Sequence, residues 1–278
     1  MKKNYIPGTQ LATSRLGFGT ASIHQAYRAS DRHTLLSEAL DIGYTHFDTA
    51  RMYGEGMAER TLGKFLSGGL RQHVTLATKF GYPAVPLLEY APGLMYGQRV
   101  ASSLIRRLSL SKGRERKRLI SLEAAESSLT RSMKALQTDW LDIFFVHEPQ
   151  ISDIDNLQEL AEWLIKQKSC GRVRYLGLAG SAKNCLEVKR QVKGVFDILQ
   201  VEDSLSCCEA DIIQAACLPF QITYGYLRLA KVRDNESMSQ AMDGLEVMKS
   251  ALARNPDGMV LLSTRKIHRL RDFANLVD

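Results

Sequence analysis

The feature that most constrains the fold is a repeating alternation of short apolar runs with longer segments of helical periodicity. Each apolar run is followed by a segment predicted to be helical, such as residues 122–136, where apolar residues recur every three or four positions behind Ser121. Strands that alternate with helices form parallel sheets covered by helices, so we predict an α/β fold. The eight predicted strands are residues 16–20, 44–48, 74–79, 140–147, 173–179, 198–202, 221–226 and 259–263.

The number of strand–helix units indicates how the sheet is completed. A (β/α)8 TIM barrel typically takes about 250 residues, and the chain has 278. An open doubly wound sheet is the alternative. No linker-like segment divides the chain, so we expect residues 1–278 to form a single barrel domain, with a long βα loop at about 81–118.

Composition excludes several other classes of protein. Charged residues make up 24% of the chain and hydrophobic ones 45%, and no apolar run approaches the roughly 18 residues of a membrane span. The first residues lack the apolar core of a signal peptide, so we expect a cytoplasmic protein without a membrane partner. The five cysteines show no metal-ligand spacing, so we expect reduced thiols and no metal. We place Cys207 and Cys208 in a helix.

Most of the net charge of +7 comes from residues 106–118, where seven basic side chains stand against Glu115. Such a run could contact nucleic acid. It lacks the interleaved aromatic residues of many nucleic-acid surfaces, so we interpret it as a solvated loop and expect no nucleic-acid partner.

Three of the predicted strands end in polar or ionisable residues. These are Asp48, Lys79 and His147, and Tyr53 comes five positions after Asp48. In a TIM barrel, the carboxyl ends of the strands surround the active site. We therefore expect these four side chains to meet at one mouth.

A set of this kind suits the reduction of a carbonyl group. Hydride arriving at the carbon leaves charge on the oxygen, which must receive a proton. A tyrosine with a pKa of about 10 is a reluctant donor, and a neighbouring ammonium lowers that pKa. We expect Lys79 to act on Tyr53 in this way, with Asp48 holding the lysine and His147 orienting the carbonyl.

The sequence around these residues resembles the aldo-keto reductase signature. The segment from Asp48 through Ala50, Tyr53 and Gly54, with Glu59 downstream, matches its pattern. Lys79 and His147 fall where that family has its lysine and histidine, and the similarity extends over nearly the whole chain. The resemblance implies Tyr53 as general acid, tuned by Lys79 and Asp48, with His147 orienting the substrate.

The strongest sequence signal for a cofactor lies near the end of the chain. Gly17 and Gly19 resemble part of a Rossmann glycine loop but lack the third glycine, so we set that interpretation aside. Barrels often bind phosphate at the helix that follows the last strand. Basic side chains crowd this position, which favours the 2′-phosphate of NADP(H) over NAD. The candidates are Ser263, Thr264, Arg265, Arg269 and Asp272.

The resemblance assigns roles to some of these residues and adds two more. It implies that Thr264 and Arg269 contact the adenosine phosphate and that Asp272 meets the adenine. It also implies that Gln200 holds the nicotinamide carboxamide and that Tyr224 stacks on the nicotinamide ring.

The sequence departs from the family pattern at several positions. Ala179 and Gly180 stand where the family usually has a Ser-Asn pair that grips the carboxamide, which removes both side-chain contacts. Gly225 and Tyr226 replace a Ser-Pro pair. The chain also ends at Asp278 without the long C-terminal loop that shapes many pockets of the family, as in shorter bacterial-type members.

The sequence thus predicts an NADP(H)-dependent oxidoreductase that reversibly reduces an aldehyde or ketone to an alcohol by direct hydride transfer. A small-molecule carbonyl or alcohol is the expected partner, and a monomer or weak homo-oligomer the expected state. The alternative is an NADP-binding regulatory or sensor subunit with the same fold and slow turnover.

Overall fold

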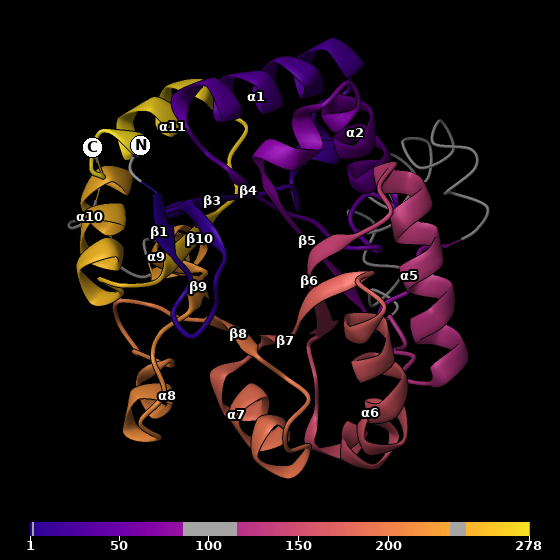
Figure 1. The fold of residues 1–278 in the computed structure, drawn as a ribbon. Coiled ribbons are helices and arrows are strands. Elements are labelled where there is room, and N and C mark those ends of the chain that lie inside the picture. The colour runs from indigo at the N-terminus through magenta and orange to yellow at the C-terminus, as the bar shows by residue number, and fades with distance from the viewer. Residues whose placement is uncertain (2, 86–115, 234–242, 278) are drawn as a thin grey trace, which may run out of the picture.

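The computed structural model describes residues 1, 3–85, 116–233 and 243–277. Eight parallel strands form a closed barrel in the order β10-β3-β4-β5-β6-β7-β8-β9, and helices surround it (Figure 1). The predicted (β/α)8 TIM barrel is confirmed. The assignment of residues 1–278 to one domain stays a prediction, and most of the expected 81–118 loop lies outside the described residues.

The barrel strands lie within two residues of their predicted positions. The seventh was predicted too long at its carboxyl end, because Gly225 adopts a φ of +108° and Tyr226 begins a helix. The strands are β3 (Leu16–Gly19), β4 (His46–Asp48), β5 (Thr75–Phe80), β6 (Leu141–His147), β7 (Val173–Gly180), β8 (Ile198–Glu202), β9 (Ile222–Tyr224) and β10 (Met259–Leu262).

Helices connect successive strands and pack on the outside of the barrel. The α-helices are α1 (Ala29–Ile42), α2 (Met57–Leu66), α5 (Leu122–Leu136), α6 (Ile154–Ser169), α7 (Ala182–Gln191), α8 (Asp211–Ala215), α9 (Tyr226–Arg233), α10 (Gly244–Arg254) and α11 (Ile267–Ala274). Short 3-10 helices are η1 (Ile23–Gln25), η2 (Leu70–His73) and η3 (Ile151–Asp153).

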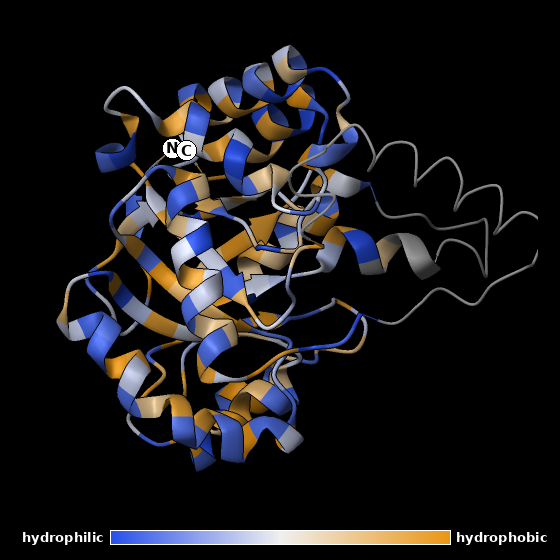
Figure 2. Cartoon of the chain, turned by 90° about the vertical axis from the view of Figure 1, so that its right-hand side faces the viewer, coloured by the Kyte–Doolittle hydropathy of each residue, from blue (hydrophilic) through white to orange (hydrophobic). Residues whose placement is uncertain are grey.

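Two apolar layers hold the barrel together. All seven residues of β6 are buried, as expected for a strand covered on both faces. One layer lies between the strands and the helices, and the other fills the barrel interior with residues such as Ile143, Phe145 and Ile198. Figure 2 shows the same division, with apolar strands inside and helices that carry both polar and apolar bands. The interior of the barrel is therefore a packed core and not an open channel.

A short hairpin that the sequence did not predict covers the amino-terminal end of the barrel. Its strands β1 (Lys3–Tyr5) and β2 (Ala12–Ser14) pair antiparallel. Between them Ile6 and Leu11, both nearly fully buried, join the interior core. The hairpin therefore seals the end opposite to the carboxyl ends of the strands.

One smaller prediction was wrong. Cys207 and Cys208 lie in a turn before α8, not in a helix, and Cys208 has a φ of +53°. Its neighbour Ser204 explains the turn, because the Ser204 hydroxyl accepts a hydrogen bond from the Cys207 amide at 3.1 Å. Among the described residues, no helix combines the length and the apolar character needed to cross a bilayer.

Candidate active site

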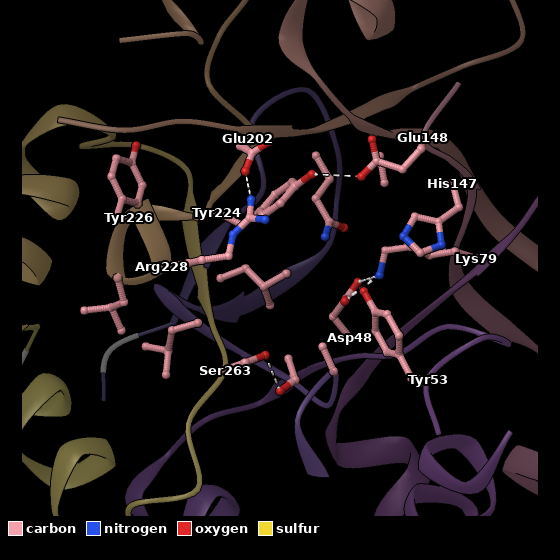
Figure 3. Close-up of a pocket in the computed structure, with 18 of the residues that line it drawn as sticks. Asp48, Tyr53, Lys79, His147, Glu148, Glu202, Tyr224, Tyr226, Arg228 and Ser263 are labelled. Carbon is pink, nitrogen blue, oxygen red and sulfur yellow. Dashed lines mark hydrogen bonds and ion pairs between the residues drawn. The ribbon is translucent and has the colours of Figure 1, made fainter. Parts of the chain in front are cut away.

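A pocket of about 380 Å³ opens at the carboxyl ends of the barrel strands. It is lined by residues from separate strands, which is the arrangement that barrel enzymes use. The predicted residues that line it are Asp48, Tyr53, Lys79, His147, Gln200, Tyr224 and Ser263. Figure 3 shows the first four on one side of the pocket, with Tyr224 across from them. The structure thus brings the predicted quartet together.

Lys79 and Asp48 form a buried ion pair at the floor of the pocket. The Lys79 Nζ lies 2.5 Å and 2.6 Å from the two Asp48 oxygens, and it also donates to the Thr49 carbonyl at 3.0 Å. Both side chains are about 2% exposed. Burial raises the pKa of Asp48 and lowers that of Lys79, and the attraction between the two charges opposes both shifts. The pair fixes the lysine in one position.

Tyr53 lies over this ion pair. The Lys79 Nζ is 5.3 Å from the centre of the Tyr53 ring, and Figure 3 shows the phenol oxygen directed toward the pair. The turn that carries Tyr53 is tight, because Gly54 adopts a φ of +56° with the His24 Cβ beside it. A side chain at position 54 would collide with His24, so glycine holds Tyr53 against the pocket.

The direction of the Tyr53 pKa shift differs from the sequence expectation. We expected the Lys79 ammonium to lower it. In the structure, burial raises the pKa of the Tyr53 hydroxyl well above its usual value, and the negative charges of Asp48 and Glu148 add to the rise. The main physical reason is the burial of the phenol, and Asp48 balances the charge of Lys79 beside it. Tyr53 is therefore a protonated phenol at neutral pH.

His147 lies next to Tyr53 on the same side of the pocket. The two rings meet edge to face with their centroids 5.9 Å apart. The Tyr82 ring also meets the histidine edge to face, with a centroid distance of 5.5 Å. Burial, together with the charge of Lys79, lowers the pKa of His147 to about 3. The imidazole is therefore neutral at physiological pH, with one nitrogen able to donate and one able to accept a hydrogen bond.

The lowered pKa values of two buried histidines predict how the stability of the protein depends on pH. Burial lowers the pKa of His46 and of His147 to about 3, whereas the unfolded chain takes up these protons near pH 6.5. Unfolding therefore binds protons between these values, and stability should fall as the pH drops through this window. Each histidine contributes a slope of about 1.4 kcal/mol per pH unit.

Urea unfolding of wild type and His147→Gln between pH 6.5 and pH 4.5 measures this slope. The variant should have a slope smaller by about 1.4 kcal/mol per pH unit. Buried acids with raised pKa values, such as Asp48 and Asp142, act in the opposite direction in both proteins, so the difference isolates His147. Equal slopes would show that His147 is protonated in the native state.

Gln200 lines the pocket and has a buried side-chain acceptor. The residue is 3% exposed and lies at the middle of β8, beside Ala179 on β7. A hydrogen bond from its side chain lowers the pKa of Asp48. Its Oε1 is buried and has no hydrogen-bond partner among the described residues. A buried acceptor without a partner is costly, so this atom is suited to a donor on a bound ligand.

Tyr224 and Glu148 form the opposite wall. The Tyr224 hydroxyl lies 3.5 Å from a Glu148 oxygen, and the Tyr224 ring borders the cavity. Burial raises the pKa of Glu148, while the Tyr224 hydrogen bond and nearby Arg228 lower it in part. The structure thus places the predicted Tyr224 at the pocket wall, with Glu148 beside it.

The sequence prediction did not include Glu202 as a site residue. It ends β8 and lines the pocket, where it forms an ion pair with Arg228 from α9 (Figure 3). The strand-end rule that identified Asp48 would also have found Glu202.

The predicted phosphate residues lie around the start of α11. Ser263 lines the pocket and donates to the Gly19 carbonyl at 2.7 Å. Thr264 is buried, and its hydroxyl accepts from the Lys266 amide at 3.1 Å. Arg265, Arg269 and Asp272 follow it and do not line the pocket itself. Of these residues, Ser263 borders the pocket, and the chain after it leads into α11.

Glu59, the downstream acid of the signature segment, lies outside the pocket. It is fully buried, pairs with the buried Arg51, and accepts a hydrogen bond from the Thr78 hydroxyl at 2.7 Å. Glu55 accepts from the Val85 amide at 2.8 Å and pairs with Arg116. These acids tie the turn of Tyr53 to its surroundings. Among the described residues, no group of three or more His, Cys, Asp or Glu side chains could hold a metal ion.

The comparisons with known proteins point to one family. The model of the Aldo/keto reductase family matches residues 15–221. The aldo-keto reductase yakc, named for NADP(+), from Schizosaccharomyces pombe is 28% identical over 218 residues, which cover 75% of this chain and 55% of that protein. D-threo-aldose 1-dehydrogenase from Pseudomonas sp is 27% identical over 183 residues, which cover 63% of this chain and 53% of that protein. The chain spans about half the length of these relatives.

A solved structure shares the fold over the full chain. The aldo-keto reductase from Klebsiella pneumoniae in complex with NADPH superposes with a TM-score of 0.67 at 20% identity, covering 100% of this chain and 90% of that one. At this identity the likeness concerns the barrel architecture.

Proposed function

Because the chain belongs to the aldo-keto reductase family, we propose that it reduces an aldehyde or ketone to the alcohol with NADPH, reversibly and by direct hydride transfer. The observation that carries the proposal is the convergence of Asp48, Tyr53, Lys79 and His147 on one pocket. These residues come from three strand ends and one turn, and together they provide a proton donor, a neutral histidine and a fixed ammonium.

The donors on one side of the pocket suit a carbonyl oxygen. With the oxygen between Tyr53 and His147, both side chains can donate hydrogen bonds to it, and the Lys79 ammonium below stabilises the charge that develops. The high pKa of Tyr53 keeps its proton available at neutral pH, and transfer of that proton to the oxygen completes the alcohol. Asp48 holds Lys79 in place throughout.

The residues present suit NADP(H). The unpaired Gln200 Oε1 offers an acceptor to the carboxamide, and Tyr224 offers a ring face to the nicotinamide. We propose that Ser263, Thr264, Arg265, Arg269 and Asp272 hold the adenosine end, where the start of α11 favours a phosphate. When bound, the cofactor supplies the hydride. The name of the yakc relative supports NADP over NAD.

The remaining expectations stay predictions. They are a cytoplasmic location, a monomeric or weakly associated state, and a small-molecule partner. The alternative role as an NADP-binding sensor subunit also stays open to test, since it needs the same pocket but little turnover.

The decisive experiment follows NADPH absorbance with a panel of aldehydes, ketones and aldoses, and NADP+ reduction with the matching alcohols. Aldoses belong in the panel because one relative is D-threo-aldose 1-dehydrogenase. We expect NADPH consumption with at least one carbonyl, and a slower rate with NADH. Tight NADPH binding without turnover on any compound would contradict the enzyme proposal and favour the sensor role.

A further inference from the structure

Glu148 is held at the pocket wall by its own backbone. Its amide donates to the Ala179 carbonyl at 2.7 Å, and its carbonyl accepts from Arg118 at 3.0 Å. Its φ of +51° lies in the left-handed region, which is strained for a residue with a side chain. This fixed backbone directs the Glu148 carboxylate toward the Tyr224 hydroxyl (Figure 3).

The Glu148 carboxylate lies beside Gly180, close to where a side chain at that position would begin. A Cβ on Gly180 would lie 3.0 Å from the Glu148 Oε2, which is tighter than most Cβ contacts. Ala179, the residue before it, contributes only a methyl group. Glu148 therefore covers the end of β7, where the chain offers no polar side chain of its own.

Among the described residues, no ion pair joins the Glu148 carboxylate to a cation, although the charge of Arg228 acts on it. Lys79 pairs with Asp48, and Arg228 pairs with Glu202. Among the described residues, the one hydrogen bond to the Glu148 carboxylate comes from the Tyr224 hydroxyl, at a long 3.5 Å. The carboxylate thus keeps most of its acceptor capacity.

A second unused acceptor lies two strands away on the same rim. Strand register places His147 beside Ala179, and Ala179 beside Gln200, so Glu148 and Gln200 flank the end of β7. Adjacent strands are about 4.8 Å apart, which leaves a span of roughly 10 Å that these two long side chains border. The Gln200 Oε1 lacks a partner, as described above. This end of the pocket offers acceptors, whereas the Tyr53 end offers donors.

We propose that the Glu148 carboxylate and the Gln200 Oε1 together accept hydrogen bonds from the amino group of the nicotinamide carboxamide. A primary amide has two N–H donors, one for each acceptor. A nicotinamide ring on the face of Tyr224 has its edge near the Tyr224 hydroxyl, which is where Glu148 lies. Glu148 thereby replaces the contacts that Ala179 and Gly180 cannot make. The inference rests on the proposed NADP(H) function.

The test compares binding of NADP+ with binding of its 3-acetylpyridine analogue, which has a methyl group in place of the amino group. Dissociation constants come from calorimetry, without turnover. Wild type should bind the analogue about 10- to 100-fold more weakly, because two buried acceptors stay unpaired. Glu148→Gly removes the carboxylate and suits the left-handed backbone, so it avoids added strain.

In Glu148→Gly, NADP+ affinity should fall at least tenfold, while affinity for the analogue changes little, so the preference for NADP+ shrinks. Glu148→Gln keeps one acceptor oxygen, so its preference for NADP+ over the analogue should lie between those of wild type and Glu148→Gly. Glu202→Gln is the matched control: it removes a charge from the same pocket and should shift both affinities together, leaving their ratio unchanged. Thermal unfolding checks that each variant is folded.

A preference in Glu148→Gly within twofold of the wild-type value would overturn this role of Glu148. In that case wild type would still bind NADP+, and the proposed function would stand. If wild type binds NADP+ at no concentration tested, the proposed function fails and this inference fails with it.

Discussion

Tyr53→Phe should lower kcat for carbonyl reduction by roughly 10²- to 10⁴-fold, the usual contribution of a positioned general acid. The substitution removes one oxygen and leaves the ring that packs against His147 and lies over Lys79. NADPH affinity should therefore stay within a few-fold of wild type. Steady-state kinetics on the best carbonyl of the panel, with NADPH binding by fluorescence, measures both quantities.

Tyr175→Phe is the matched control. It also removes a single phenol oxygen, but at the amino-terminal end of the barrel, where that oxygen accepts a hydrogen bond from the Gln10 amide at 3.0 Å. It should leave kcat near the wild-type value. A Tyr53→Phe enzyme that keeps more than a tenth of wild-type kcat would show that another group delivers the proton.

The same geometry predicts how the two reaction directions respond to pH. Burial and two neighbouring acids keep the Tyr53 hydroxyl protonated well above neutrality, which is the form needed for reduction. Alcohol oxidation needs the phenolate, so its rate should rise with pH through the neutral and alkaline range. This contrast belongs to the Tyr53 prediction, since Tyr53→Phe should abolish it.

Glu59→Ala should destabilise the protein by about 3–5 kcal/mol, the range for breaking one half of a buried ion pair. Glu59 is fully buried against the buried Arg51, and it accepts a hydrogen bond from Thr78, the residue before Lys79. Its removal deletes the buried carboxylate that pairs with the Arg51 guanidinium and accepts from the Thr78 hydroxyl. Urea unfolding at pH 7 measures the loss.

Glu126→Ala, an exposed glutamate on α5, should change stability by less than about 0.5 kcal/mol and serves as the control. A Glu59→Ala loss below about 1 kcal/mol would contradict a structural role for this acid. Glu59→Gln separates the two contributions, because it keeps an oxygen for Thr78 but gives up the charge that balances Arg51.

The barrel could be predicted because its pattern is local. Apolar runs of strand length alternate with helical stripes, and this alternation alone implies parallel strands covered by helices. The hairpin at the amino-terminal end was missed because its strands have three residues each. Its stability comes from Ile6 and Leu11, which pack against the barrel interior. Hydrophobic periodicity in the sequence does not indicate such a contact.

The convergence of the four candidate catalytic residues could be predicted for a similar reason. Asp48, Lys79 and His147 each follow directly after an apolar run, and the carboxyl ends of parallel strands share one side of a barrel. Residue type and position in the sequence therefore determined which side chains meet. The same rule applied to Glu202 would have placed it in the pocket, where the structure has it.

Tertiary structure alone decided what these groups do to one another. The sequence suggested that Lys79 acidifies Tyr53, but the fold sets Asp48 against the ammonium and buries the phenol, so the Tyr53 pKa rises. Glu59 belongs to the signature segment, yet the fold turns it into the core. Glu148 covers a glycine on a neighbouring strand. Burial and charge balance depend on distances between residues across the barrel, and the sequence alone does not give these distances.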